Sequence, residues 1–335
     1  MKLCYALRRG VFYPSQRDVF GEVPPRDCRS AYLEAVRGLG FDGIEVPAWL
    51  VDDHLTGHPD PASDVAIREF RAEVEGAGLT IACVRGGGPV SDPRLGPATL
   101  ARLHQVVHFT AIAGASVINV TCGSAVTDPR GPGALRIGEP VAQGSSRGCS
   151  EADFERTARH FREITSRAAD LGLEVAIEVH QGSLADNSWS ALHLADLVDL
   201  PSFGVNPDLG NIYWQYDQPE ETSEAAIIAL APRAKYWHCK NLRRILFPEL
   251  RHAIFQRVPL PEGDIDYRFA IGAMLAAGYT GYAAIEGVNI GDQLTQDGRS
   301  AKYFHDMLGA YAKETQSASD VKRDAGKAPE HGVAR

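Results

Sequence analysis

The feature that most constrains the fold is a regular alternation of short apolar β-type runs with longer stretches of helical period. Eight such runs occur along the chain, at Lys2–Leu7, Gly43–Val46, Thr80–Val84, Ser116–Thr121, Glu174–Val179, Phe203–Asn206, Lys235–His238 and Tyr282–Ile285. Amphipathic segments separate them, and several of these segments end in glycine, as helices commonly do. Eight βα units predict a closed (β/α)8 TIM barrel of the α/β class.

The alternative to a closed barrel is an open, doubly wound sheet, which alternating strands and helices can also build. The first run is followed by Leu7-Arg8-Arg9-Gly10-Val11-Phe12, which lacks the Gly-rich loop typical of dinucleotide-binding sheets. A chain of 335 residues, 44% of them hydrophobic, is long enough to fill one barrel. We therefore expect a single-domain barrel over residues 1–313.

Three long connections and the C-terminal segment depart from this pattern. The connections cover residues 10–27, 122–150 and 243–266, and long loops inside a compact domain are typically lids or contact surfaces. Residues 314–335 carry mainly charged and small side chains without apolar periodicity. That composition predicts a flexible, disordered C-terminal tail.

Charge and composition narrow the classes of partner. The formal net charge of −9 argues against nucleic acid, because phosphate binding normally requires clustered lysine and arginine. The first residues lack the apolar segment of a signal peptide, and no apolar run approaches the ~20 residues that span a bilayer. We expect a cytoplasmic protein that contacts no membrane and acts on a small molecule. Six cysteines without CxxC spacing are expected to be free thiols: Cys4, Cys28, Cys83, Cys122, Cys149 and Cys239.

Four polar strings lie where apolar runs end. They are Ile177-Glu178-Val179-His180, Pro207-Asp208-Leu209-Gly210-Asn211, Trp237-His238-Cys239-Lys240-Asn241 and Ala284-Ile285-Glu286-Gly287. Intervals of 30 residues separate Glu178, Asp208 and His238, about one βα unit each, and Glu286 follows after 48. Active sites of TIM barrels lie at the C-terminal ends of the strands, so these four side chains are predicted to converge.

One imidazole and three carboxylates form a ligand set for one divalent ion, with Mn²⁺ or Mg²⁺ as first choice and Co²⁺ or Zn²⁺ as alternatives. Lys240, two residues after His238, points to the same side of the strand and is suited to contact a substrate oxygen. His180 is a candidate acid or base. Other interpretations are open: Glu178 could be a salt-bridged carboxylate, Asp208 a helix N-cap, and either histidine an ordinary structural residue.

The order Glu, Asp, His, Glu on the last four strands, with the string His238-Cys239-Lys240-Asn241, resembles the xylose isomerase-like sugar isomerase/epimerase barrels. Gly40-Phe41-Asp42-Gly43-Ile44-Glu45 resembles that family's second-strand opening. The resemblance implies metal ligation by Glu178, Asp208, His238 and Glu286, with the two glutamates also moving protons. Arg244, six residues after His238, matches an arginine that often contacts substrate in its epimerases, and Asn211 and Glu45 complete the expected substrate contacts. Those epimerases often carry a histidine at the position of Asn211, so this residue argues against simple ketose epimerisation.

Two longer strings are similar to the alpha subunits of C-glycoside deglycosidases: His180-Gln181-Gly182-Ser183-Leu184-Ala185-Asp186-Asn187-Ser188-Trp189 and Asn206-Pro207-Asp208-Leu209-Gly210-Asn211-Ile212-Tyr213-Trp214. This resemblance implies a carbon–carbon bond-cleaving lyase. Its substrates would be 3-oxo-glucosyl C-glycosides, its products an aglycone and an anhydro-keto-sugar, and its partner a small beta subunit. Catalytic candidates are then His180, Glu286, Glu178 and Lys240, and candidate aromatic contacts are Trp189, Tyr213, Trp214, Phe247 and Phe255.

Three alternatives accompany this interpretation. The first is a ketose isomerase, epimerase or inosose dehydratase with the same barrel. The second is a metal-free binding or scaffold subunit, whose chemistry would lie in a partner. The third is a barrel endonuclease, which the charge of −9 and the few clustered histidines disfavour.

Overall fold

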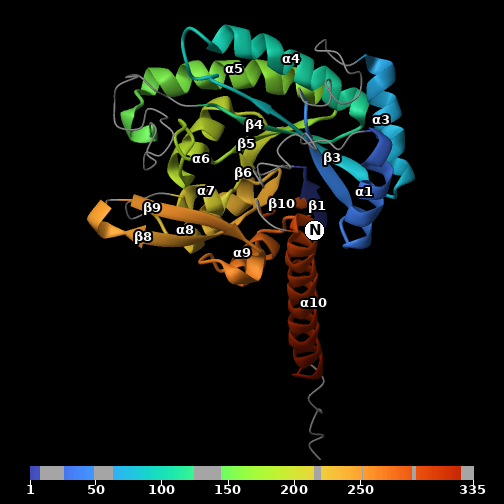
Figure 1. Cartoon of the computed structure of the whole chain (residues 1–335). Coiled ribbons are helices and arrows are strands. Elements are labelled where there is room, and N and C mark those ends of the chain that lie inside the picture. Colours follow the sequence, from blue (N-terminus) through green and yellow to red (C-terminus); the bar gives the residue numbers. More distant parts are fainter. Residues whose placement is uncertain are drawn as a thin grey trace, which may run out of the picture.

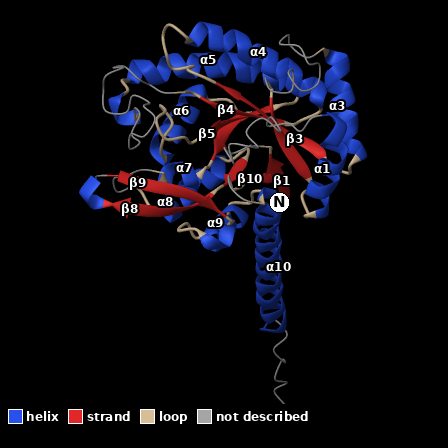
Figure 2. Ribbon diagram, viewed as in Figure 1, coloured by secondary structure: helices blue, strands red, loops and turns tan. Residues whose placement is uncertain are grey.

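The computed structural model shows strands surrounded by helices (Figures 1 and 2), and it describes residues 1–7, 26–48, 63–123, 145–214, 220–250, 252–288 and 292–325. The barrel strands are β1 (Lys2–Ala6), β2 (Gly43–Pro47), β3 (Thr80–Gly87), β4 (Val117–Thr121), β5 (Glu174–Glu178), β6 (Phe203–Asn206), β7 (Trp237–Cys239) and β10 (Tyr282–Ile285). All eight predicted barrel strands are therefore present.

The eight strands form one parallel sheet in the order β6-β5-β4-β3-β2-β1-β10-β7. The two end strands meet through a parallel bridge between Val205 and Ala234, and the Lys235 amide donates to the Val205 carbonyl at 3.0 Å. This contact makes the sheet a nearly closed cylinder. The predicted (β/α)8 TIM barrel is confirmed.

Helices pack around this cylinder and connect its strands. They are α1 (Arg26–Gly38), α3 (Asp64–Gly76), α4 (Gly96–Ala113), α5 (Glu151–Asp170), α6 (Ser188–Val198), α7 (Leu209–Tyr213), α8 (Ser223–Leu230), α9 (Tyr267–Ala276) and α10 (Gln293–Ala325). Short polar side chains begin several of them: those of Ser63, Asn187, Thr222 and Asp266 accept backbone N–H groups of the first turn. Among the described helices, none has the length and apolarity needed to cross a membrane.

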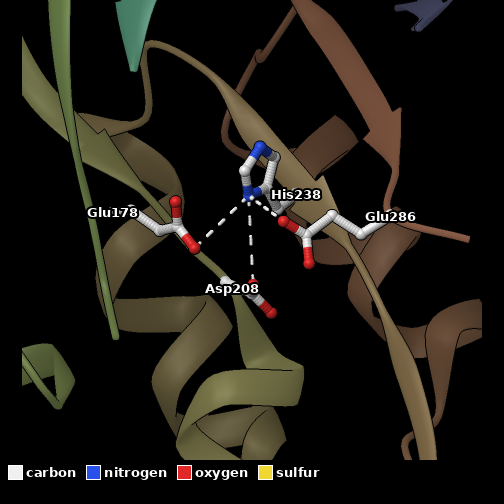
Figure 3. Close-up of side chains that lie close together, drawn as sticks. All are labelled: Glu178, Asp208, His238 and Glu286. Atoms are coloured by element: carbon white, nitrogen blue, oxygen red, sulfur yellow. Dashed lines mark ion pairs between the residues drawn. The ribbon is translucent and has the colours of Figure 1, made fainter. Parts of the chain in front are cut away.

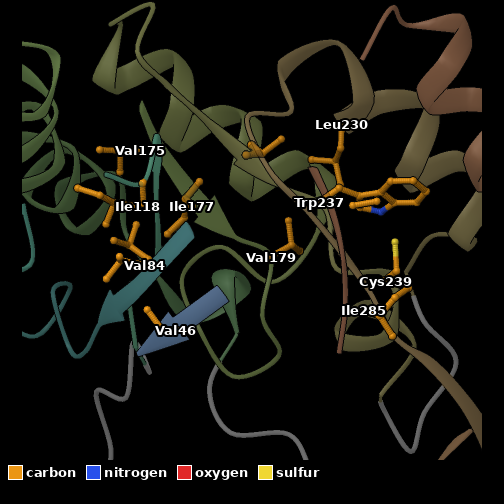
Figure 4. Close-up of a cluster of buried hydrophobic side chains, with 14 of the residues drawn as sticks. Val46, Val84, Ile118, Val175, Ile177, Val179, Leu230, Trp237, Cys239 and Ile285 are labelled. Atoms are coloured by element: carbon orange, nitrogen blue, oxygen red, sulfur yellow. The ribbon is translucent and has the colours of Figure 1, made fainter. Parts of the chain in front are cut away.

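Strand alternation divides the buried side chains into two clusters. Figure 4 shows part of the larger cluster, which lies between strands and helices and includes Val175, Ile177 and Trp237. The smaller cluster gathers Cys4, Ala82, Cys83, Val117, Ala176, Tyr236 and Ala284. Because Ala176 lies between Val175 and Ile177 yet joins the other cluster, successive residues of β5 face opposite sides.

Two elements differ from the sequence-based expectation. The connection predicted as a long loop over residues 243–266 contains an antiparallel hairpin, formed by β8 (Asn241–Phe247) and β9 (His252–Val258), which projects from the barrel in Figure 1. Helix α10 continues past residue 313 to Ala325, so 314–325 are helical here. The rest of the predicted tail, 326–335, lies outside the described residues, as do most of the predicted loops 10–27 and 122–150.

The cysteines agree with the expectation of free thiols where they are described. Cys4, Cys83, Cys122, Cys149 and Cys239 form no disulfide. The side chain of Cys28 lies outside the described residues.

Candidate metal centre

Glu178, Asp208, His238 and Glu286 come together at the C-terminal end of the barrel (Figure 3). Glu178 is the last residue of β5, His238 lies in β7, and Glu286 directly follows β10. Asp208 follows β6 and is also the N-cap of α7, where its side chain accepts the Asn211 amide. One ligand atom from each of the four buried residues lies within 4.8 Å of the others.

The three carboxylates point at one nitrogen of His238. Its Nδ1 lies 3.2 Å from Glu286 Oε1, 3.6 Å from Glu178 Oε1 and 3.9 Å from Asp208 Oδ2. This nitrogen is buried and, within the described part of the chain, has no hydrogen-bond partner. A buried ring nitrogen without a hydrogen bond, facing three carboxylates, is what a bound cation would explain.

The other ring nitrogen of His238 contacts the carboxylate of Glu45. Its Nε2 lies 2.7 Å from Glu45 Oε2, and Glu45 Oε1 accepts a hydrogen bond from Arg85 Nη1 at 3.0 Å. A carboxylate on one ring nitrogen favours a proton there and leaves the opposite nitrogen as the ligand. The chain Arg85–Glu45–His238 therefore aims Nδ1 at the carboxylates.

Amide side chains orient the carboxylate of Glu178. Asn119 Nδ2 donates to Glu178 Oε2 at 2.9 Å, and Asn211 Nδ2 donates to Glu178 Oε1 at 3.0 Å. Asn206 links this pair to the histidine strand, since it donates to Asn119 Oδ1 and accepts the His238 amide. Neither Asn119 nor Asn206 was predicted from the sequence to be part of the site.

Lys240 lies between the remaining carboxylates. Its ammonium group donates to Asp208 Oδ2 at 2.7 Å, Asn211 Oδ1 at 2.6 Å and Glu286 Oε2 at 2.9 Å. An ammonium group has three protons, and these three acceptors use all of them. Lys240 thus fixes the carboxylates at the centre.

The charged groups at the centre change one another's pKa values. Burial opposes ionisation of Glu178, yet the positive charge of His238 holds the pKa of this carboxyl well below its ordinary range. Burial alone would lower the pKa of His238, but Glu45, Glu178 and Glu286 raise it to about 10. The carboxylates therefore attract positive charge to Nδ1, where a divalent ion would replace the proton.

The donor set fits one divalent ion. Three carboxylates supply hard oxygen ligands and the imidazole supplies one borderline nitrogen, a set suited to Mn²⁺, Mg²⁺, Co²⁺ or Zn²⁺. No cysteine joins the cluster found among the described residues. The residues present could thus hold the predicted metal, whose identity they leave open.

A family model for the xylose isomerase-like TIM barrel matches residues 33–305. The chain belongs to this family. Comparison with curated protein sequences gives no match.

Solved structures share the fold of this xylose isomerase-like barrel. A xylose isomerase-like TIM barrel protein from Mycobacterium smegmatis, in complex with magnesium, has 22% identity and a TM-score of 0.70, over 92% of this chain and 97% of that one. A probable 3-DHS dehydratase from Bacillus anthracis has 17% identity and a TM-score of 0.64, over 90% and 98%. A 3-keto-D-glucoside 4-epimerase from E. coli has 17% identity and a TM-score of 0.62, over 91% and 99%.

The other predicted site residues of this xylose isomerase-like barrel do not belong to the cluster of four candidate metal ligands. His180 is half-buried after β5, and its Nδ1 lies 2.8 Å from the Gln181 carbonyl. Arg244 lies on β8 with its guanidinium 5.2 Å from the centre of the Tyr213 ring. Glu45, expected to contact substrate, is fully buried behind His238, because its carboxylate bridges that ring and Arg85.

The hairpin supplies a residue that the sequence analysis did not select. Arg257 in β9 reaches the centre, with Nη2 3.7 Å from Glu286 Oε2. The signal available in the sequence was an arginine in the connection that follows the histidine strand, but nothing local showed which arginine would face the metal residues. Its position follows from the pairing of β9 with β8.

Three of the five candidate aromatic contacts gather beside Lys240 and Arg257. The ring centre of Phe255 lies 5.8 Å from that of Trp214 and 6.5 Å from that of Tyr213. The Lys240 ammonium lies 5.9 Å from the Trp214 ring centre. Trp189 instead stacks on His193 and is 61% exposed, and Phe247 is exposed on the hairpin.

Proposed function

We propose that the chain is a divalent-metal-dependent enzyme that removes a proton from the carbon next to a sugar ketone. The observation that carries this proposal is the set of three carboxylates around His238 Nδ1, held in place by Lys240, Asn211 and Glu45. When bound, the ion would supply Lewis-acid polarisation of the substrate ketone. The donor set suits Mn²⁺ or Mg²⁺ first.

The residues around the centre suggest a division of work. His180 is the proposed base, because donation from Nδ1 to the Gln181 carbonyl leaves Nε2 able to accept a proton. Glu286 and Glu178 are alternative proton carriers, as the family resemblance implies. Lys240 and Asn211 contact the carboxylates, so we propose positioning roles for them in place of the expected catalytic role of Lys240 and the expected substrate contact of Asn211. Arg244 remains a proposed substrate contact. For Glu45 we propose a positioning role through His238 in place of substrate binding.

The more specific proposal is a lyase that acts on 3-oxo-glucosyl C-glycosides. Loss of the proton next to the ketone would be followed by cleavage of the bond between the sugar and the aglycone, whose carbon takes up a proton. The products would be the free aglycone and an anhydro-keto-sugar. The group formed by Tyr213, Trp214 and Phe255 supports this proposal, since an aryl aglycone could pack against it.

The proposed lyase would work in the cytoplasm as the alpha subunit of a hetero-oligomer. Its small beta subunit is part of the proposal because the strings at residues 180–189 and 206–214 are similar to such alpha subunits. The exposed hairpin residues Ile245, Phe247 and Ile254 offer apolar surface on one of the long connections.

A ketose isomerase, epimerase or dehydratase is the second candidate. It is favoured by the likeness to an enzyme named for epimerising 3-keto-glucosides and to a dehydratase, although these likenesses concern the fold. The buried Asn211 weighs against epimerisation, because it stands where the epimerases often carry a histidine and is hydrogen-bonded to Lys240 and Glu178.

The test is incubation of the Mn²⁺-loaded protein with a 3-oxo-glucosyl C-glycoside and, separately, with ketoses, followed by chromatography of the products. We expect release of free aglycone by the unsubstituted protein and none by Glu286→Gln. Glu249→Gln, an exposed glutamate on the hairpin, is the matched control and should retain activity. Interconversion of ketoses without aglycone release would support the second candidate, and equal activity of Glu286→Gln would contradict the proposed site.

A further inference from the structure

Arg257 places a second cation beside the candidate metal centre. Its side chain is 15% exposed, and Nη2 lies 3.7 Å from Glu286 Oε2. The guanidinium carbon lies 5.7 Å from the centre of the Trp214 ring. Its Nε is buried and has no hydrogen-bond partner among the residues that the structure describes.

The hairpin register explains why Arg257 faces the centre. Leu242 pairs with Arg257 and Arg244 pairs with Phe255, so these four side chains share one face of the two-stranded sheet. Arg243 and Gln256, the intervening pair, belong to the opposite face. The face that bears Arg257 also carries Phe255 onto Trp214, next to Lys240.

The contacts of Arg257 within the described residues leave its buried Nε without an acceptor. Burying an N–H donor of a guanidinium without an acceptor is unfavourable. The ion pair with Glu286 is long, and Lys240 already donates to the same oxygen at 2.9 Å. Lys240 is therefore the closer cation to Glu286, and an acceptor supplied by a ligand would explain the unsatisfied Nε of Arg257.

The charged side chains around the centre indicate the sign of the charge that the ligand carries. Four carboxylates, those of Glu45, Glu178, Asp208 and Glu286, face three fixed cations, Arg85, Lys240 and Arg257. Asp297, whose carboxyl also interacts with Arg257, is mainly protonated below its pKa of about 7 and adds no charge there. With His238 neutral as a ligand, a divalent ion leaves one excess positive charge. A single negative charge on the substrate would balance it.

We propose that Arg257 is a specificity-determining residue that binds an anionic oxygen of the substrate beside the metal. This inference rests on the proposed function, because it places the substrate at the same centre. The oxygen belongs to a carboxylate or to an ionised phenol, both of which match the planar donors of a guanidinium. The neighbouring Trp214 and Phe255 rings suit a substrate whose anionic group adjoins an apolar or aromatic part.

The experiment is calorimetric binding to the full-length, Mn²⁺-loaded protein with two pairs of probes. Hydroxypyruvate and dihydroxyacetone share a hydroxyketone and differ in the carboxylate. The second pair is the 4-nitrophenolate anion, used above the pKa of 4-nitrophenol, and the neutral 4-nitroanisole. The variants are Arg257→Gln and Arg257→Lys, with Arg243→Gln as matched control on the opposite face of the hairpin.

We expect Arg257→Gln to weaken binding of hydroxypyruvate or 4-nitrophenolate by about tenfold or more, since a charge-assisted hydrogen bond is lost. Binding of the neutral probes and of Mn²⁺ should be unchanged, Arg257→Lys should recover part of the affinity, and Arg243→Gln should behave like the unsubstituted protein. The pair of probes whose anionic member loses affinity in Arg257→Gln identifies the bound oxygen as that of a carboxylate or of a phenolate.

Two results would overturn the inference: anion affinities that Arg257→Gln leaves unaltered, or an equal loss for neutral probes and Mn²⁺, which would indicate a structural role. The assay needs no turnover, so failure to cleave a C-glycoside contradicts the specific lyase proposal alone. Absence of Mn²⁺ binding by the unsubstituted protein would contradict both.

Discussion

His238 illustrates how a single side chain defines the centre through both of its ring nitrogens. Nδ1 faces three carboxylates, and Nε2 is fixed by Glu45, which Arg85 holds in turn. All three side chains of this chain of contacts are buried. Glu45 and Arg85 therefore set the orientation of the imidazole from the side of the ring opposite the three carboxylates.

Replacement of Glu45 by glutamine tests this positioning role. The amide is uncharged and accepts a weaker hydrogen bond from Nε2, so His238 should be a poorer and less well oriented ligand. We expect metal affinity to fall by roughly 10–100-fold while the protein stays folded. Titration of metal-stripped protein with Mn²⁺ would measure this affinity. The control is Glu34→Gln, on the exposed face of α1. An unchanged affinity in Glu45→Gln would show that the contact does not support the ligand.

Single residues were predictable from sequence where their role depends on strand position. Glu178, Asp208, His238 and Glu286 could be selected because each ends or follows an apolar run, and the barrel brings strand ends together. Glu45 was selected too, as a substrate contact, and the structure places its carboxylate between His238 and Arg85. Its contact with His238 joins β2 to β7, which are not neighbours in the sheet, and no local pattern reveals such a contact.

At the scale of elements, one buried carboxylate joins α10 to β1 and to the segment that follows β10. Asp297, near the start of α10, accepts the Tyr5 hydroxyl at 2.7 Å and the Val288 amide at 2.9 Å. A side chain at Gly287 would overlap this carboxylate, so Gly287 allows the segment after Glu286 to pass close to the helix. The position of Glu286 thus depends on how β1, β10 and α10 meet.

The ionisation of Asp297 should make stability depend on pH. Burial raises the pKa of Asp297 from 3.8 to about 7, while the Tyr5 and Val288 hydrogen bonds act in the opposite direction. The folded chain therefore keeps this proton to higher pH than the unfolded chain. The resulting contribution to stability is complete below about pH 4 and is lost as pH rises to about 7, by up to about 1.4 kcal/mol per pH unit.

Asp297→Asn removes this titration. Between pH 5 and pH 7 we expect the unfolding free energy of the unsubstituted protein to fall relative to that of the variant, as measured by urea unfolding. Asp306→Asn, on the exposed side of the same helix, is the control and should leave the pH dependence unaltered. Parallel pH profiles for Asp297→Asn and the unsubstituted protein would contradict the raised pKa.

Helices and strands were predictable where the hydrophobic periodicity of the sequence was strong, and their prediction failed where it was weak. The barrel strands are short apolar runs bounded by polar turns, and all eight were recognised. Strands β8 and β9 were assigned to a loop, because Asn241-Leu242-Arg243-Arg244-Ile245-Leu246-Phe247 does not alternate polar and apolar residues. A projecting hairpin has no core face to impose that alternation, and this is why Arg257 was missed.

At the scale of the whole molecule, the barrel converts four separate strand ends into one site. The strands run parallel, so Glu178, Asp208, His238 and Glu286 meet although they span more than a hundred residues of the chain. Burial of like charges at this point is unfavourable without a cation. A divalent ion should therefore stabilise the fold as well as serve the proposed chemistry, by about 2.7 kcal/mol when its free concentration is about a hundred times Kd.

The most direct test of the metal centre is the stoichiometry of Mn²⁺ binding to metal-stripped protein, measured by calorimetry for the unsubstituted chain and for His238→Ala. Circular dichroism would verify that both are folded, and His305→Ala, on the exposed side of α10, is the control. We expect one ion per chain for the unsubstituted protein and for the control, and no ion at this site in His238→Ala. Absence of binding by the unsubstituted protein, or undiminished binding by His238→Ala, would contradict a metal centre at these four residues.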